Sequence, residues 1–213
     1  MLIAGGGKNA EAREGPSTLF NPGTKVFALV DGPEIGMDHR AVRLEDGRVF
    51  IFGGMEPGEL RPSAKIWVFD PQTGRVVLKG TMRQARAGHT ATLLPDGKIL
   101  MAGGISKGIG KGILASGELY DPVTGMSGLT GKLKRARTGH AAVLLPTGRV
   151  MVLGGWTLDK DGNRIFPGEI EMYDPDTGTW GIQDTQPYGV EDPILFIQYS
   201  GNTFVSGTIQ SSK

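Results

Sequence analysis

The feature that most constrains this chain is a pair of adjacent glycines that follows a histidine at a spacing of 14 residues. The complete copies are His39 with Gly53-Gly54, His89 with Gly103-Gly104, and His140 with Gly154-Gly155. Asp192 takes the histidine position ahead of Ser206-Gly207, and Leu2-Ile3-Ala4-Gly5-Gly6 is a copy cut short by the chain start. Diglycines that recur about every 50 residues are typical of propellers and repeat arrays.

A second motif, an aromatic residue followed by Asp-Pro-x-Thr-Gly, lies between the diglycines. Its copies are Phe69–Gly74, Tyr120–Gly125 and Tyr173–Gly178, with Phe20–Thr24 as a weaker first copy. Two independent motifs in constant order and phase predict a single domain of tandem repeats over residues 1–213. The expected repeats are 1–36 (partial), 37–86, 87–137, 138–189 and 190–213 (partial).

The chain has 35 glycines and 13 prolines, a content that indicates disorder when it is scattered without period. Here these residues occupy fixed repeat positions, so they predict turns in an all-β protein. The net charge of +1 gives no bias toward nucleic acid or a membrane, and no apolar run is long enough to span a bilayer. Because cysteine is absent, disulfides, thiolate metal sites and cysteine nucleophiles are excluded, and the redox compartment stays open.

Each repeat predicts four strands, a to d, and no helix. Strand a covers 88–94 in the clearest copy, and Asp96-Gly97 turns the chain into strand b, with both residues expected at positive φ. Strand b is a continuous apolar run, which predicts burial on both faces. The b runs are Val49–Phe52, Ile99–Ala102 and Val150–Leu153. Strand c leads into the second motif, whose glycine is expected in the left-handed region before strand d.

Together, the histidine, the diglycine and the aromatic-Asp-Pro-x-Thr-Gly segment resemble kelch repeats, particularly those of bacterial proteins. The resemblance covers nearly the whole chain and implies an all-β, kelch-type β-propeller in which each repeat is a four-stranded blade around a central axis. The chain supplies about four blades plus a partial one, roughly seventeen strands, whereas kelch propellers more usually have six or seven blades. Strand a near 194–199 could complete the first blade. Three organisations stay open: a four- or five-bladed ring, an excerpt of a larger propeller, or a protomer whose ring closes by association.

The predicted connectivity places the short a–b and c–d turns on one face and the variable b–c and d–a loops on the other. The b–c loops are 55–62, 105–114 and 156–167. Variable loops on a regular scaffold usually carry binding. This second face, the loop face, is therefore the candidate site.

Arg86 and Arg137 lie three residues before repeat histidines, at the mouth of strand a on the loop face. The other repeats have Gly36 and Gly189 there. Similar arginines in the kelch adaptors of ubiquitin ligases contact acidic peptides, so the resemblance implies an anionic ligand, for which a guanidinium is suited. The favoured alternative is a structural ion pair with a neighbouring blade or with Glu118 or Glu171.

Four further residues complete the predicted binding set. Lys107, Lys111 and Arg135 add positive charge to the loop face, and Trp156 follows a diglycine into a variable loop. Trp156 could stack on a sugar or anchor a partner, although packing within the loop is the favoured interpretation. The segment 132–137 is the densest basic patch, and we expect it to be solvated rather than to bind nucleic acid.

Two patterns suggest metal sites but fit a structural role better. Three histidines can bind zinc, but the equivalent positions of His39, His89 and His140 spread them over different blades. We therefore predict structural hydrogen bonds, no metal and no cofactor. The segment 159–163 resembles part of a calcium loop, but its glycine comes too early and the ligating glutamate is missing. A polar hairpin tip is expected there.

The expected function is non-enzymatic binding of a protein or glycan through the loop face, with self-association as a further expectation. A surface, secreted or virion assembly fits best, so an extracellular, cell-surface or virion location is favoured. No nucleophile–base pair, paired carboxylates or phosphate loop is recognisable, and the copper chemistry of galactose-oxidase relatives is excluded because it needs a cysteine. No signal peptide is visible, but the chain begins in mid-repeat, so we do not take residue 1 as the natural start.

Two alternatives stay open. One is a sugar-acting, isomerase-like kelch enzyme with a deep axial pocket lined by Arg86, Arg137 and carboxylates. The other is an adaptor that binds acidic peptides through the same two arginines.

Overall fold

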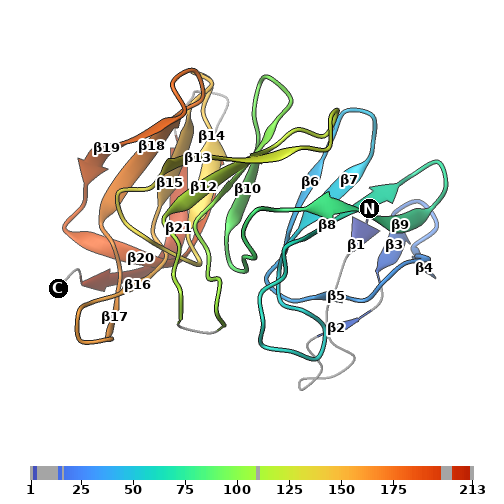
Figure 1. The fold of residues 1–213 in the computed structure, drawn as a ribbon, viewed down its shortest axis with the longest axis horizontal. Helices are drawn as coiled ribbons and strands as arrows, with labels where there is room; N and C mark the ends of the chain where they lie inside the picture. Colours follow the sequence, from blue (N-terminus) through green and yellow to red (C-terminus); the bar gives the residue numbers. More distant parts are fainter. Residues whose placement is uncertain (1, 4–13, 16, 109–110, 198–202, 212–213) are drawn as a thin grey trace.

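The computed structural model describes residues 2–3, 14–15, 17–108, 111–197 and 203–211. In this part of the chain every regular element is a strand, and there is no helix that could cross a membrane. Small antiparallel sheets follow one another in an arc, from the blue N-terminal sheet of Figure 1 to the orange and red C-terminal sheets. The predicted all-β class is confirmed, and the side-by-side sheets are arranged as propeller blades.

Three sheets are complete blades with the strand order a-b-c-d. They comprise β6 (Arg40–Arg43), β7 (Val49–Phe52), β8 (Lys65–Asp70) and β9 (Arg75–Thr81); β10 (Thr90–Leu93), β11 (Ile99–Ala102), β12 (Ser116–Tyr120) and β13 (Ser127–Lys132); and β14 (Ala141–Leu144), β15 (Val150–Leu153), β18 (Glu169–Asp174) and β19 (Thr179–Thr185). The predicted bounds of all three b strands are confirmed. Strands β6, β10 and β14 contact one another in turn, so the a strands line the axis.

The arc ends in two partial sheets and also carries two short ribbons. The partial sheets are β1 (Leu2–Ile3), β3 (Thr18–Asn21) and β4 (Val26–Leu29), and β20 (Tyr188–Ile197) with β21 (Thr203–Ser211). The ribbons, which were not predicted, pair β2 (Glu14–Gly15) with β5 (Ile35–Gly36) and β16 (Thr157–Leu158) with β17 (Arg164–Ile165). The second ribbon ends in the expected polar hairpin tip, where the Asp159 carboxylate accepts the backbone N–H groups of Asp161 and Asn163.

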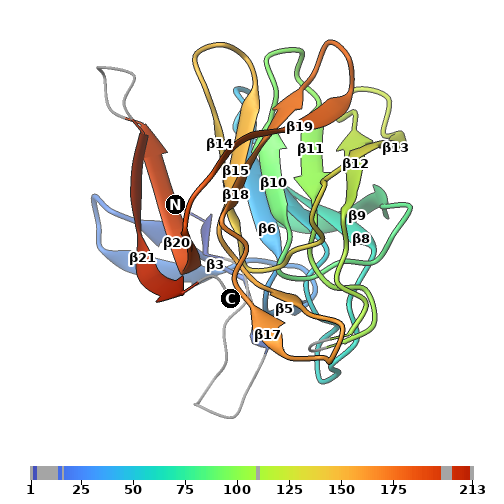
Figure 2. The ribbon, with the colours of Figure 1, turned by 90° about the vertical axis from the view of Figure 1, so that its left-hand side faces the viewer.

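Within the described residues the C-terminal strand does not complete the first blade. There β20 pairs only with β21 (Figure 2), and β1 pairs only with β3. The reason is that β20 and β21 form a long hairpin of their own, beside the inner strand β14. Gly5-Gly6, the diglycine of the first copy, lies outside the described residues.

The a–b turns differ from the prediction, because only their glycines have positive φ. Gly47 has φ 88° and Gly97 has φ 82°, whereas Asp46 and Asp96 do not enter the left-handed region. In the first turn the Gly47 N–H donates to the Leu44 carbonyl, which gives a type I turn followed by a left-handed glycine. The aspartate instead accepts a backbone N–H two residues on, and this bond fixes the turn without strain. In the Asp-Pro-x-Thr-Gly turns the glycines are left-handed, as predicted.

The core lies between the blades. One cluster joins Phe50 and Phe52 of the β6–β9 blade to Tyr120 of the next, with both phenylalanine rings 5.6 Å from the tyrosine ring. A second cluster joins Leu100 to Tyr173 across the following junction. All four residues of β11 are buried, so the predicted burial of both faces is confirmed for this strand. Each buried aromatic or aliphatic side chain stabilises the array by about 1.5–3 kcal/mol.

Diglycines bring successive blades into contact because they leave room for the histidine of the next blade. A Cβ on Gly53 would lie 2.2 Å from the Arg86 carbonyl oxygen and 3.2 Å from the His89 ring. The Gly54 N–H donates to the same Arg86 carbonyl over 3.0 Å. The next junction repeats this arrangement with Gly103, Gly104, Arg137 and His140.

At the last junction Pro193, not Asp192, occupies the histidine place. The Pro193 ring would lie 2.8 Å from a Cβ on Gly154, and pairing with β21 resumes at Ile194 opposite Ser206 after a register shift that follows Glu191. Asp192 has φ 48° and thus takes the left-handed position that precedes each histidine. The predicted alignment of Asp192 and Ser206-Gly207 with the earlier motifs is therefore wrong by one residue.

Candidate functional site

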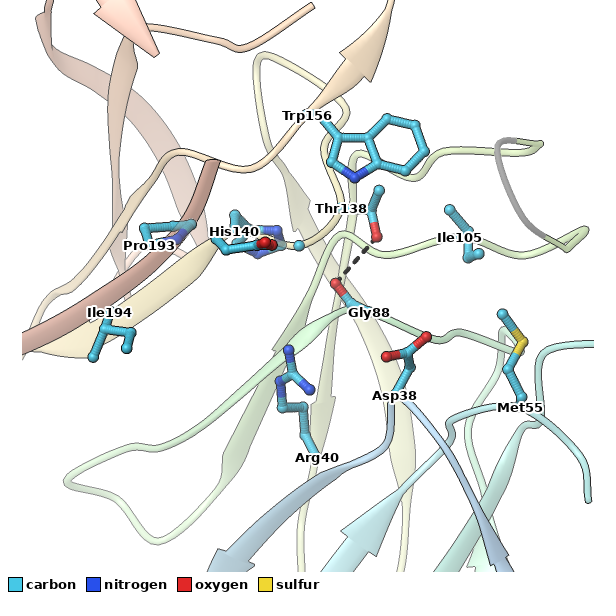
Figure 3. A pocket seen from close by; sticks show the side chains of 12 residues that line it. Asp38, Arg40, Met55, Gly88, Ile105, Thr138, His140, Trp156, Pro193 and Ile194 are labelled. Atoms are coloured by element: carbon cyan, nitrogen blue, oxygen red, sulfur yellow. Dashed lines mark hydrogen bonds between the residues drawn. The ribbon is translucent and has the colours of Figure 1, made fainter. Parts of the chain in front are cut away.

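A pocket of about 530 Å³ opens where the axis meets the loop face (Figure 3). Three of its lining residues, Met55, Ile105 and Trp156, directly follow the diglycines of successive repeats. Others are the residues that precede the histidines and Pro193: Asp38, Gly88, Gly139 and Asp192. The b–c and d–a loops therefore share one face, as predicted, and their inner ends surround the axial pocket.

Four left-handed residues form part of this wall, and two of them carry carboxylates. Gly88 and Gly139 both have φ 63°, which glycine adopts freely, whereas Asp38 has φ 60° and Asp192 has φ 48°. Side chains in this region cost about 1 kcal/mol or more, and aspartate is among the few that tolerate it. The two carboxylates are exposed and form no hydrogen bond or ion pair with the described residues. Two repeats thus place a carboxylate without a hydrogen-bond partner among the described residues at the mouth of the pocket.

Arg40 supplies the positive charge of the axial pocket. Its guanidinium points into the space between Asp38 and His140 in Figure 3, and its Nη1 donates to the His39 carbonyl over 2.9 Å. Burial lowers the pKa of Arg40, and the nearby Asp38 carboxylate opposes that effect. Arg40 was not among the predicted site residues, because strand a of the other repeats has Thr90 and Ala141 in its place and no repeat motif marks it.

Trp156 forms the aromatic wall of the axial pocket. The Arg164 guanidinium lies 4.2 Å from the centre of the indole ring, a cation–π contact that fixes the ring. The backbone of Trp156 pairs with that of Thr138, whose hydroxyl donates to the Gly88 carbonyl. In Figure 3 the indole nitrogen points toward Thr138, so the N–H edge faces the pocket. Trp156 is half-buried: it packs within its loop and also lines the site.

The three histidines lie at equivalent places in successive blades, as expected, but their hydrogen bonds differ. His39 contacts the Gly36 carbonyl over 2.8 Å and His140 the Thr90 hydroxyl over 3.1 Å. Both ring nitrogens of His89 are buried without a partner among the described residues, so the predicted hydrogen bond is absent there. Burial lowers the pKa of His89 and His140 well below the ordinary value, and neighbouring arginines add to the effect. Both imidazoles are therefore neutral at pH 7.

Arg86 and Arg137 lie inside their blades and away from the pocket lining. The Arg86 guanidinium is fully buried 3.3 Å from the equally buried Glu118 carboxylate, and it donates to the carbonyls of Gly103 and Ser116. Arg137 repeats the arrangement with Glu171 at 2.9 Å, as one of the two interpretations predicted. Burial lowers the pKa of both arginines, and the paired glutamate of each opposes that shift. A ligand-binding role for Arg86 and Arg137 stays a prediction, and neither is among the described residues that line the axial pocket.

The remaining predicted residues are dispersed. Lys107 and Lys111 are exposed in the 105–114 loop outside the pocket lining. Arg135 forms an exposed ion pair with Glu169. Only Trp156 of the predicted set lines the axial pocket, together with Asp38, Arg40 and Asp192, which were not predicted as binding residues. Within the described residues no group of three potential metal ligands gathers.

Comparison with known proteins bears on the family. No family model matches the chain. An F-box/kelch-repeat protein of Arabidopsis thaliana is 26% identical over 185 residues, 81% of this chain and 44% of that protein. Human Kelch-like protein 38 is 27% identical over 78% of this chain and 27% of its own length, and alpha-scruin of Limulus polyphemus is 28% identical over 67% and 16%. The chain thus spans less than half the length of the curated relatives that it matches.

The solved structure of YjhT supports the fold. It superposes with a TM-score of 0.74 over 99% of this chain and 76% of its own length, at 15% sequence identity. At this identity the likeness extends to the architecture and no further. The motifs, the bladed sheets and the curated matches agree on a kelch-type β-propeller fold.

Proposed function

We propose that this propeller is a non-enzymatic module that binds a protein partner through the loop face, with the axial pocket at the centre of the contact. The observation that carries the proposal is the lining of that pocket, where the free carboxylates of Asp38 and Asp192, the Arg40 guanidinium and Trp156 converge. Such a site offers charge of both signs beside an aromatic wall. Aromatic and arginine side chains are the residue types that most often dominate binding energy at interfaces.

The curated matches support a binding function, because several are named as kelch proteins and the name of one combines kelch repeats with an F-box. In this chain the opposite face has short polar turns of repeated sequence, whereas the loop face has loops that differ from blade to blade. A surface that differs between repeats can recognise one partner, whereas identical turns present the same chemistry at every blade.

The test compares capture of partners by the wild type, a loop-face variant and an opposite-face variant. We expect Trp156→Ala combined with Arg40→Ala to lose partners that the wild type retains, as measured by quantitative mass spectrometry of the captured proteins. Lys98→Glu, on the a–b turn of the opposite face, is the matched control and should retain them. Equal capture by all three proteins, or loss through Lys98→Glu alone, would contradict the proposal.

A glycan is the second candidate ligand, favoured by the combination of carboxylates, guanidinium and indole N–H in one pocket. These groups provide both donors and acceptors, which hydroxyl groups require. Binding to a glycan array that is lost in Asp38→Asn would support this candidate. Retention of protein partners by the same variant would assign the two ligand classes to different parts of the face.

Self-association is a further proposal. Within the described residues the outer edges of β4 and β21 have no partner strand, and Phe27 and Ile209 are 61% and 66% exposed. Light scattering coupled to size exclusion tests it: a mass that is a multiple of 22.6 kDa supports closure between copies, and a monomer at all concentrations overturns it.

A further inference from the structure

The β6–β9 blade has an open slot at the place where the next two blades hold a buried arginine. In register, Gly36 and Trp67 of this blade correspond to Arg86 and Glu118 of the β10–β13 blade. Both members of the ion pair are therefore replaced together. A cleft of about 360 Å³ lies there, lined by Gly36, Gly53 and Trp67 among others. It opens between the d–a and b–c loops on the loop face.

The backbone acceptors of the filled slots persist in the empty one. Arg86 donates to the carbonyls of Gly103 and Ser116, and the corresponding carbonyls here belong to Gly53 and Lys65. The Gly53 carbonyl receives no hydrogen bond from the residues that the structure describes. A hydrogen-bond donor that enters the slot would therefore find this acceptor available.

The chain cannot fill this slot from position 36. A Cβ on Gly36 would lie 2.0 Å from the Met55 carbonyl oxygen, so no side chain fits there. The ring of Trp67 instead lines the cleft and presents an aromatic surface where the other blades have a carboxylate. A planar cation can stack on such a surface.

The charges around the slot also favour a cation. Glu34 and Glu56 line it against a single ammonium, that of Lys65, so the lining is negative by one charge. The Lys65 ammonium forms an ion pair with the Glu56 carboxylate over 2.8 Å at the rim of the slot, and the Lys65 side chain is 43% exposed. Its ammonium lies over the Trp67 ring, 6.0 Å from the ring centre, so this surface already attracts a cation, which an incoming guanidinium would displace.

We propose that this slot binds the guanidinium of an arginine side chain from the protein partner, in the place that Arg86 and Arg137 occupy in their own blades. The guanidinium donates to the carbonyls of Gly53 and Lys65 and stacks on the indole of Trp67. The inference rests on the proposed function, since it names one residue type in the partner. It uses a different part of the loop face from the axial pocket.

The test titrates the whole protein with N-acetyl-arginine amide, followed by the NMR signals of the backbone amides and indole N–H groups. N-acetyl-citrulline amide is the control ligand, because it has nearly the same shape but no charge. We expect arginine, but not citrulline, to shift the signals of Gly53, Lys65 and the Trp67 indole. Equal shifts with both ligands, or arginine shifts confined to other residues, would overturn the proposal.

Two variants at one position sharpen the result. Trp67→Ala should weaken arginine binding about five-fold or more, because it removes the stacking surface. Trp67→Glu restores the carboxylate of the other blades and should tighten arginine binding, a gain that mere disruption of the fold cannot produce. Lys98→Ala, on the opposite face, should bind arginine as the wild type does. Unchanged or weaker binding by Trp67→Glu would count against the guanidinium slot.

The outcome is independent of the axial-pocket experiment. If arginine fails to bind while Trp156→Ala with Arg40→Ala still loses its partners, only the slot is wrong. If arginine binds but partner capture does not depend on the axial pocket, the slot stands and the proposed function fails.

Discussion

The β6–β9 and β10–β13 blades share strand order, turns and diglycines but differ in how they fix the loop that enters strand a. In the β10–β13 blade Arg86 and Glu118 form a buried ion pair, and Glu118 also accepts the backbone N–H of Arg83. In the β6–β9 blade the same place holds Gly36 and Trp67 around an open cleft. The repeat scaffold therefore does not depend on the ion pair. Its loss changes a structural position into one that a ligand can reach.

The largest expected effect is from Arg86→Ala. Removing one member of a buried ion pair leaves the Glu118 carboxylate uncompensated, which costs about 3–5 kcal/mol of unfolding free energy. Urea denaturation measures it. The double variant Arg86→Met with Glu118→Leu should recover most of the loss, because apolar residues often replace a buried pair at little cost. A loss below about 1 kcal/mol for the single variant would show that the pair has no structural role.

The next largest effect concerns the close contact between a diglycine and the following blade, which both blades make. Gly53→Ala should lower the unfolding free energy by about 2–3 kcal/mol, because it adds strain at φ 57° and a Cβ 2.2 Å from the Arg86 carbonyl oxygen. Gly74→Ala is the matched control: its φ is 70°, but nothing lies within 4 Å of the added Cβ. It should cost only about 1 kcal/mol. Thermal and urea unfolding of both variants would give the difference, and equal losses would refute the close-contact argument.

The third effect depends on pH. The pKa of His89 and of His140 is well below its ordinary value in the folded chain, so the unfolded chain binds protons that the folded chain does not. Stability is therefore complete above about pH 6.5 and falls as pH drops below it, by up to about 1.4 kcal/mol per pH unit and per histidine. Urea unfolding at pH 7.5 and 5.5 checks this. His89→Gln should reduce the slope more than His39→Gln, since His39 is less buried; the reverse order would contradict the explanation.

The smallest effect is expected at Trp156. Arg164→Ala removes the cation–π contact and the ion pair of Arg164 with Glu191, both at a partly exposed site, which should together cost about 0.5–1 kcal/mol of stability. A larger loss, measured by thermal unfolding, would mean that the β16–β17 ribbon supports more of the blade than these two contacts. Arg164→Lys serves as the control, because it keeps a cation near the indole.

The sequence predicts the repeated parts of the fold well. Strand b, the second-motif turns and the equivalence of the histidines depend on local patterns, and the structure confirms them. The Arg86–Glu118 pair was also among the predictions, because both residues recur at fixed places. One error lies in the repeated a–b turns, where Asp46 and Asp96 do not have positive φ. The other errors lie where the repeat changes: Asp192 is displaced by one residue because Pro193 replaces histidine, and β20 pairs with β21 instead of completing the first blade.

The candidate site was less predictable. Arg40, Asp38 and Asp192 line one pocket only because the repeats are arranged around the axis, and neither Arg40 nor Asp38 belongs to a repeat motif. In the sequence, the slot in the β6–β9 blade shows only as the absence of an arginine and a glutamate from two repeat positions. The joint replacement of Arg and Glu by Gly36 and Trp67 could have indicated the slot. This replacement is apparent once the strands of the two blades are aligned by their pairing register.

The contact between a diglycine and the histidine of the following repeat has an evolutionary consequence. Because Gly53 with His89 and Gly103 with His140 make the same junction, duplication or deletion of a whole repeat recreates a junction that already works. A lineage can therefore change its number of blades in single steps. Insertion of one residue between a histidine and its diglycine shifts the strand register and is selected against, so the loops absorb the variation in length.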